Sequence, residues 1–269
     1  MARHALSVHG EVWCLHELVH NGAVVDELRK KGMRFVERLE EVPEGGVVLF
    51  SAHGVTPYVR AQATARRLKV IDATCPFVAR AHRQVREFSA RGVPVVVVGR
   101  AEHVEVVGLM GECASPQGLA VVTDAAAVAA LPFPEGGPVG VVCQTTLSSG
   151  TVRDVLSALR ARYPHLLESP ASDTCTATRN RQQAVNEFVR AGALSATGVL
   201  VIGSANSSNT ARLVEIARKA GAAAWRVDGP DELSACDFSG IERLGLTAGA
   251  STPEAIVKDV VAVSSRISR

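Results

Sequence analysis

Short apolar runs alternate with longer amphipathic stretches along most of this chain. The apolar runs have the length of strands, are rich in Val, Leu and Ile, and end in Gly, Ser, Thr or Asn. We predict strands at residues 11–18, 46–52, 93–99, 119–123, 139–144, 197–203, 222–227 and 243–248. Helical spacing of apolar positions lies between them, for example at residues 23–32, 151–163 and 210–221. This alternation predicts an α/β fold with mainly parallel sheets.

Two segments of the chain repeat each other. The run "DATCP" at 72–76 and the run "SDTCT" at 172–176 place Cys75 and Cys175 100 residues apart. Both cysteines are followed by a Glu-Phe pair and, 17 residues on, by a glycine that is typical of a helix end. An apolar strand pattern follows each glycine. Each cysteine is therefore expected to begin a helix, where backbone amides and the helix dipole favour a thiolate.

The first 21 residues fit the second half of the same repeat. A helix pattern ends at Gly10, and a strand and a polar loop with His20 follow. A third cysteine would lie about seven positions before Met1, so we expect the chain to begin inside a repeat. We predict three α/β lobes at residues 1–76, 77–171 and 172–269, of which the first is incomplete.

Composition limits the class of protein. Apolar residues make up 47% of the 269 residues and the formal charge is +2, which indicates a globular protein and gives no sign of a nucleic-acid partner. The longest apolar runs have strand length, well short of the roughly 18 residues of a membrane span. We see no signal peptide and expect a cytoplasmic protein without a membrane partner.

The cysteine pattern favours metal binding or catalysis over disulfides. Six cysteines occur without a CxxC motif, which argues against a zinc ribbon. Core packing is the simple explanation for Cys14, Cys113, Cys143 and Cys236. Cys75 and Cys175 differ because they recur at helix beginnings, and for them a ligand role and a structural role remain open.

Polar side chains gather where the predicted strands end. Ligands of parallel sheets bind outside the carboxyl ends of the strands. The residues in these loops are His20, His53, His103, Glu105, Thr145, Thr146, Ser207, Ser208, Asn209 and Ser251. Helix capping alone would explain Ser208, Asn209 or Thr252 taken singly. Together, imidazoles, hydroxyls and helix N-termini suit a diphosphate.

One carboxylate lies inside this set of loop residues. Glu105 is the natural general acid, unless it is an ordinary solvated loop residue. Thr145 can orient a hydroxyl group or a water molecule. The other histidines, which we interpret as structural, are His4, His9, His16, His82 and His165.

The chain also carries a series of motifs that resembles a known family. In order, they are "HELVHN", "FSAHGV", "DATCP", "EHVEVVGLMGE", "QTTLS", "TATRNRQ", "GSANSSN" and "TAGASTP". Over essentially the whole chain they resemble the 4-hydroxy-3-methylbut-2-enyl diphosphate reductases, the LytB family of the non-mevalonate isoprenoid pathway. The resemblance implies a trefoil of three α/β lobes around a central cavity that holds a 4Fe-4S cluster.

The resemblance also implies a reaction and a set of roles. Two electrons and two protons remove the allylic hydroxyl group, giving isopentenyl and dimethylallyl diphosphate, with ferredoxin or flavodoxin as electron donor. Cys75 and Cys175 would be cluster ligands, and Glu105 with Thr145 would relay a proton near His103. The residues implied to contact the substrate are His20, His53, His103, Thr145, Thr146, Ser207, Ser208, Asn209 and Ser251.

One departure from the family pattern leaves three interpretations. Family members carry their first cluster cysteine in an N-terminal segment that this sequence lacks, and Cys14 is the nearest, poorly placed, substitute. The first interpretation is a family reductase whose start is clipped. The second is a diphosphate-binding homologue without cluster or redox activity. The third is a hydrolase with another metal, such as zinc on Cys75, Cys175 and a histidine.

Overall fold

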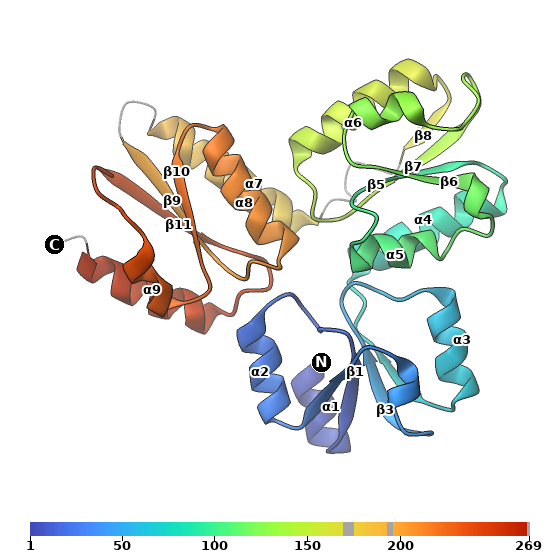
Figure 1. The fold of residues 1–269 in the computed structure, drawn as a ribbon, viewed down its shortest axis with the longest axis horizontal. Coiled ribbons are helices and arrows are strands. Elements are labelled where there is room, and N and C mark those ends of the chain that lie inside the picture. Colours follow the sequence, from blue (N-terminus) through green and yellow to red (C-terminus); the bar gives the residue numbers. More distant parts are fainter. Residues whose placement is uncertain (169–174, 193–195, 268–269) are drawn as a thin grey trace. The chain divides into compact units, whose positions relative to one another are not determined.

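Three small parallel sheets form the framework of the protein (Figure 1). The structure is a computed structural model, and it describes residues 1–168, 175–192 and 196–267. The strands of the first sheet are β1 Val12–Leu15, β2 Met33–Val36, β3 Val47–Phe50 and β4 Lys69–Asp72. Those of the second are β5 Val95–Val98, β6 Leu119–Val122, β7 Val139–Cys143 and β8 Leu166–Glu168. Those of the third are β9 Thr197–Ile202, β10 Ala223–Val227 and β11 Arg243–Ala248. The predicted α/β class with parallel sheets is confirmed.

The three sheets share one strand order. Their orders are β2-β1-β3-β4, β6-β5-β7-β8 and β10-β9-β11, so the first strand of each sheet pairs with both the second and the third. The chain therefore changes its direction of growth between β1 and β3, between β5 and β7, and between β9 and β11. Such switch points leave a crevice beyond the carboxyl ends of the two strands.

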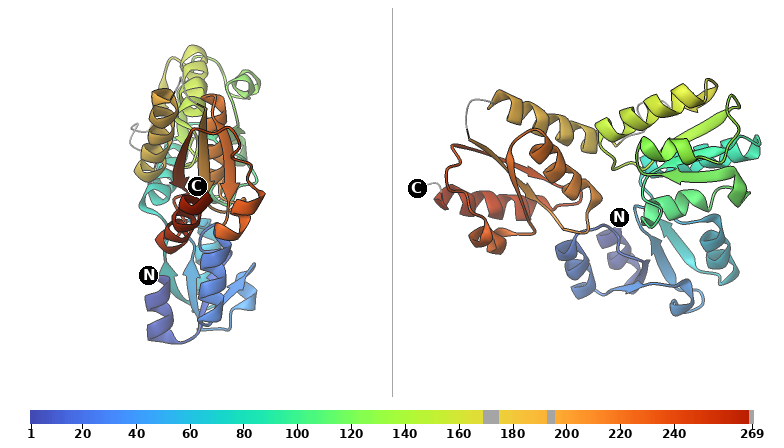
Figure 2. Two further views of the ribbon diagram at one scale, coloured as in Figure 1. Left: turned by 90° about the vertical axis from the view of Figure 1, so that its left-hand side faces the viewer. Right: turned by 45° about the horizontal axis from the view of Figure 1, so that its top comes forward.

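Helices cover the sheets (Figures 1 and 2). They are α1 Ala2–His9, α2 Gly22–Lys30, α3 Pro57–Ala65, α4 Pro76–Ala90, α5 Val104–Met110, α6 Ser149–Arg162, α7 Thr176–Ala191, α8 Ser208–Lys219 and α9 Glu254–Ile267. In the second sheet, Val95 and Val97 pack against α4 and α5, while Val96 and Val98 pack against α6. Successive strand residues point to opposite faces, so a strand made only of valine is buried on both sides.

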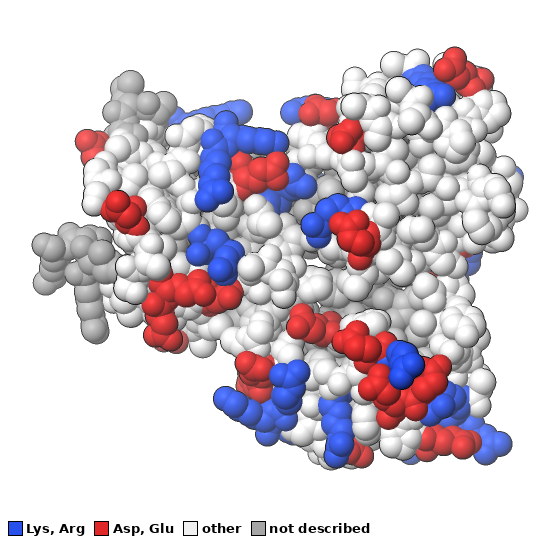
Figure 3. Space-filling view, viewed as in Figure 1, with Lys and Arg blue, Asp and Glu red and all other residues white. Residues whose placement is uncertain are grey.

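Short 3₁₀ turns complete the connections. They are η1 Leu39–Glu41, η2 Pro116–Gly118, η3 Ala126–Ala130 and η5 Pro230–Ala235. None of the helices that the structure describes combines the length and apolarity needed to cross a membrane. On the face drawn in Figure 3, positive and negative side chains are interspersed.

The sequence repeat has a structural basis. Phe88 of α4 lies against Gly140 of β7, and Phe188 of α7 lies against Gly245 of β11. An added Cβ atom would approach the phenylalanine ring to 2.5 Å at Gly140 and to 2.6 Å at Gly245. The recurrent phenylalanine therefore packs each helix onto a bare backbone position of its sheet.

Some element boundaries differ from those predicted. The first strand was predicted over 11–18 but ends at Leu15, because His16 takes a left-handed conformation with φ 59°. The edge strands β2, β4 and β8 were not predicted. They are only three or four residues long, and most of their side chains are exposed or half-buried. Glu105 was predicted in a loop and lies instead in the first turn of α5.

The chain divides into two compact units. The first contains Met1–Val19 and Val25–Thr174 with the two four-stranded sheets, and the second contains His20–Val24 and Cys175–Arg269 with the three-stranded sheet. The lobe boundaries at 76 and 171 stay a prediction. Each unit is described by itself below.

Candidate active site

The candidate residues follow the strands that flank the switch points. In the first unit, His53 follows β3, His103 and Glu105 follow β5, and Thr145 and Thr146 follow β7. In the second unit, the serines and Asn209 follow β9, and Ser251 follows β11. This placement is the one expected for ligand-binding loops of parallel sheets.

His53 and His103 lie close together in the first unit. Their ring centroids are 6.0 Å apart and the rings meet edge to face. His103 is the N-cap of α5, and its Nδ1 accepts a hydrogen bond from the backbone N–H of Glu105 at 3.2 Å. Ser51 accepts a hydrogen bond from the backbone N–H of His53 at 3.4 Å. These bonds fix the backbone of His53 and the ring of His103.

Glu105 is a buried carboxyl group, with only 1% of its surface exposed. The Thr145 backbone N–H donates to its Oε1 at 2.6 Å, and the Thr145 hydroxyl donates to its Oε2 at 3.1 Å. Burial raises the pKa of Glu105 to about 7, although the two hydrogen bonds from Thr145 act to lower it. At neutral pH the group can therefore both hold and release a proton. The alternative of a solvated loop residue is wrong.

Gln144 organises the loop that holds the two threonines. Its side-chain amide donates to the Thr146 hydroxyl at 3.0 Å, and its oxygen accepts from the backbone N–H of Arg100 at 3.2 Å. The side chain is 2% exposed. Gln144 was not among the residues predicted for the site, although a polar residue directly after a buried strand was a usable signal.

The second unit holds a separate group of polar residues. Ser207 is the N-cap of α8 and accepts from the backbone N–H of Thr210 at 3.3 Å. Ser208 is the first residue of that helix. The interpretation of Ser208 or Asn209 as helix caps is wrong, because Ser207 is the N-cap of α8.

Asn209 is a buried amide, 4% exposed. Among the described residues, neither its Oδ1 nor its Nδ2 has a hydrogen-bond partner. A buried amide in this state is costly unless a ligand or water satisfies it. Asn209 is therefore suited to contact a polar ligand.

Two distant loops meet in the second unit. The Ser251 hydroxyl donates to the backbone carbonyl of His20 at 3.3 Å, although 231 residues separate them. Thr252 is not a helix cap, because its hydroxyl donates to the Ile202 carbonyl and α9 begins only at Glu254. The segment His20–Val24 thus belongs with the loop after β11.

Cys75 and Cys175 each occupy the position just before a helix. They are the N-caps of α4 and α7, have φ of −57° and −50°, and are free and half-buried. The predicted helix beginnings are confirmed. The backbone N–H of Cys75 donates to the Ala52 carbonyl at 3.0 Å, which places Cys75 beside the loop of His53.

The donor chemistry of these two thiols fits an iron–sulfur cluster. Cysteine sulfur is the usual protein ligand of such clusters. Within residues 1–168, 175–192 and 196–267, however, no group of three or more His, Cys, Asp or Glu side chains is placed to hold a metal ion. The ligand role of Cys75 and Cys175 therefore stays a prediction.

Cys14 is unsuited to supply another thiolate. Its side chain is fully buried in β1, and this burial raises its pKa to about 12. The thiol stays protonated at neutral pH. Its interpretation as a core residue is confirmed, and Cys143 likewise lies in a strand, β7.

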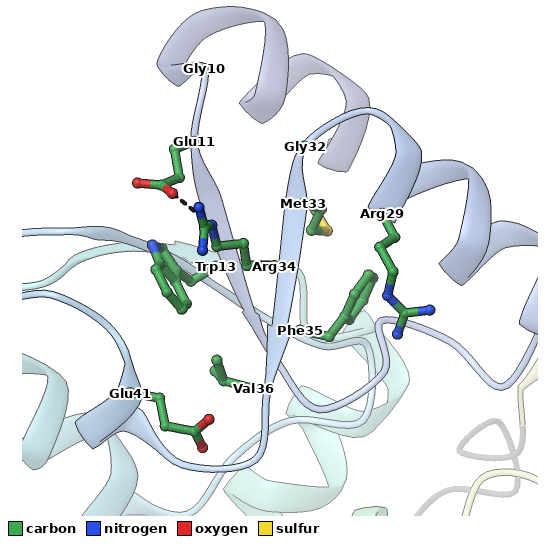
Figure 4. A pocket seen from close by; sticks show the side chains of 10 residues that line it. All are labelled: Gly10, Glu11, Trp13, Arg29, Gly32, Met33, Arg34, Phe35, Val36 and Glu41. Atoms are coloured by element: carbon green, nitrogen blue, oxygen red, sulfur yellow. Dashed lines mark ion pairs between the residues drawn. The ribbon is translucent and has the colours of Figure 1, made fainter.

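A pocket of about 690 Å³ lies elsewhere in the first unit (Figure 4). It extends along β2 and beside the amino end of β1, with Glu11 paired to Arg34 at 2.7 Å and Arg34 over the ring of Trp13. None of the candidate residues lines it. Polar groups already paired with each other make it a poor alternative site.

Fold and site together define an α/β protein with polar side chains gathered at the ends of its parallel strands and one buried carboxyl group among them. Comparison with known proteins narrows this class. The family model described as LytB protein matches residues 1–264. The chain belongs to the LytB protein family.

Individual relatives support the assignment. The chain is 46% identical over 256 residues to 4-hydroxy-3-methylbut-2-enyl diphosphate reductase 2 of Mycobacterium bovis, which covers 94% of this chain and 76% of that protein. It is 44% identical over 259 residues to the reductase of Actinobacillus pleuropneumoniae, which covers 96% and 81%. The solved structure of the E-1-hydroxy-2-methyl-but-2-enyl-4-diphosphate reductase from Plasmodium falciparum matches with a TM-score of 0.91 and 31% identity, covering 97% and 81%.

Proposed function

We propose that this chain reduces 4-hydroxy-3-methylbut-2-enyl diphosphate to isopentenyl and dimethylallyl diphosphate. The curated relatives above carry this reductase name and match over most of the chain. The reaction breaks the allylic C–O bond, and two electrons and two protons yield water and the new C–H bond.

The observation that carries this proposal is the buried Glu105 with its pKa near 7. Cleavage of the C–O bond needs a proton on the departing oxygen, because water leaves far more readily than hydroxide. Glu105 would supply that proton, with Thr145 holding the carboxyl group at 2.6 and 3.1 Å. The neighbouring His103 would stabilise the negative charge of the substrate.

The loops after the other strands would hold the diphosphate. We assign this role to His53 and Thr146 in the first unit, and to His20, Ser207, Ser208, Asn209 and Ser251 in the second. The unpartnered amide of Asn209 supports its part, since a diphosphate oxygen would satisfy the donor.

Cys75 and Cys175 would supply two ligands of a 4Fe-4S cluster. When bound, such a cluster delivers electrons one at a time and offers a Lewis-acidic iron. Ferredoxin or flavodoxin would be the electron donor.

Anaerobic reconstitution with iron and sulfide tests the proposal. The visible absorbance of the product reports the cluster, and an assay with a reduced dye reports turnover. We expect Glu105→Gln to suppress turnover strongly, about 100-fold or more, while the affinity for inorganic diphosphate stays near wild type.

Two other results would point elsewhere. Normal turnover of Glu105→Gln would exclude it as the proton donor. Diphosphate binding without cluster absorbance or turnover would instead identify a cluster-free diphosphate-binding homologue.

A further inference from the structure

A buried histidine–carboxylate pair lies beside the site in the first unit. His82 of α4 and Glu112, just beyond α5, are joined by a 2.9 Å contact between Nδ1 and Oε1. Their side chains are only 6% and 5% exposed. The proposed reaction gives this pair no role, and the cost of burying such groups calls for an explanation.

The ring of His82 lies between two glycines. A Cβ atom added to Gly54 would come within 2.7 Å of Nε2, and one added to Gly108 would come within 3.0 Å of Nε2 and Cε1. Gly54 directly follows His53, and Gly108 lies one turn after Glu105 on α5. The Nε2–Cε1 edge of the ring therefore packs against both the loop of His53 and the helix of Glu105, at a point where the His53 carbonyl also lies close to Gly108.

Glu112 orients this ring. Its second oxygen contacts Nε of Arg86, one turn further along α4, at 3.2 Å. Its backbone N–H donates to the Leu109 carbonyl at 3.1 Å, which ties it to the end of α5. The carboxylate is thus held from both helices and fixes the position of Nδ1 of His82.

The other ring nitrogen has a different environment. Among the residues that the structure describes, Nε2 of His82 has no hydrogen-bond partner, and it faces the backbone of Gly54. The contact with Glu112 is therefore made through Nδ1, and the ring touches the His53 loop through packing at Gly54. The space beside Nε2 is filled by the backbone of Gly54, and the ring fits there only because Gly54 has no Cβ atom.

We propose that His82 is a positioning residue, which sets the spacing between His53 on one side and His103 with Glu105 on the other, with Glu112 holding its ring in place. The inference rests on the proposed function for the roles of those three residues. Core filling alone would not require the contact with Glu112.

The test uses the intact chain labelled with ¹⁵N-histidine. The ring signals of His53, assigned by their loss in His53→Asn, report the position of that residue without any ligand or cluster. We expect His82→Ala to shift these signals and to weaken binding of inorganic diphosphate about tenfold by calorimetry. Glu112→Ala should act in the same direction, whereas Glu112→Gln, which keeps an oxygen acceptor, should restore both readouts.

Matched variants separate positioning from general destabilisation. His165→Ala removes an exposed histidine of the same unit and should leave the His53 signals unchanged. If His82→Ala does not fold, Gly108→Ala replaces it, because its added methyl group displaces the ring without removing it. Gly118→Ala is the control, since its nearest new contact would be 3.9 Å away.

The results test the positioning role of His82 and the proposed diphosphate site separately. Unchanged His53 signals in folded His82→Ala or Gly108→Ala would overturn the positioning role. Unchanged diphosphate affinity in His53→Asn would instead refute the proposed diphosphate site, while the His53 signals in the His82 and Gly108 variants would still decide the positioning role.

Discussion

Glu105 shows at the scale of one residue how burial and hydrogen bonding oppose each other. Removal of its charge from water raises the pKa, and the two hydrogen bonds from Thr145 favour the charged form and lower it. Desolvation is the larger effect, so the carboxyl group titrates near neutral pH. The opposing contributions can be varied separately by mutation.

The first prediction concerns the pH dependence of stability. Because folding raises the pKa of Glu105 from 4.5 to about 7, the folded chain binds this proton more tightly than the unfolded chain. Its contribution to the free energy of unfolding is therefore full below about pH 4.5 and falls as pH rises towards 7. Relative to Glu105→Gln, wild type should lose on the order of 3 kcal/mol over this range, measured by urea unfolding. Parallel curves for the two proteins would contradict the shift.

The second prediction concerns Thr145. Thr145→Val keeps the shape of the side chain and the backbone hydrogen bond but removes the hydroxyl donor at 3.1 Å. The pKa of Glu105 should then rise above its present value of about 7. A ¹³C NMR titration of labelled glutamate carboxyl groups measures it, and Thr145→Ser should behave like wild type. A lower pKa in Thr145→Val would show that the hydroxyl does not stabilise the carboxylate.

Packing between helix and strand explains the repeat at the scale of elements. Phe88 and Phe188 recur in sequence because Gly140 and Gly245 each expose a strand backbone to an aromatic ring. A buried strand can form from any apolar run of suitable length. The matched glycine and phenylalanine determine how closely α4 and α7 approach their sheets.

The third prediction tests this packing. Gly140→Ala should lower the free energy of unfolding by about 1–3 kcal/mol, because its methyl group would overlap the Phe88 ring. Loss of chain entropy in the unfolded state would offset only about 0.4–1 kcal/mol of this. Urea denaturation measures the change. Gly118→Ala, with its nearest new contact at 3.9 Å, serves as the control and should change stability by about 0.5 kcal/mol or less.

The whole molecule consists of two compact units with their own apolar clusters. We predict that Gly140→Ala speeds amide hydrogen exchange mainly in the first unit, and Gly245→Ala mainly in the second. Exchange followed by mass spectrometry on peptic fragments would show it. Equal acceleration of both units by either variant would mean that they open as one cooperative body.

The features of this structure that could be predicted are those set by patterns within a few neighbouring residues. The buried strands and the helices that begin after Cys75 and Cys175 were predicted because apolar runs and glycine stops act over a few residues. The exposed edge strand β4 was not, since pairing with β3 and not apolar burial defines it. The partnership of His82 and Glu112, 30 residues apart, is visible only in the folded chain.

The candidate site follows the same division. The loops were predicted because polar residues after strands are a local signal, and the resemblance supplied their roles. The burial of Glu105 was not predicted, because it depends on the Thr145 loop 40 residues away. Ser207, Ser208 and Asn209 are all good capping residues. Which of them caps α8 depends on backbone angles that the sequence does not show.

The assignment of His20–Val24 to the second unit has a practical consequence for anyone who divides this gene. A split between residues 168 and 175 would leave the carboxyl-terminal fragment without the stretch whose His20 carbonyl accepts the Ser251 hydroxyl. The amino-terminal fragment would carry that stretch away from its partner. If the two halves were expressed separately, complementation would therefore require residues His20–Val24 of the first fragment to bind to the second fragment.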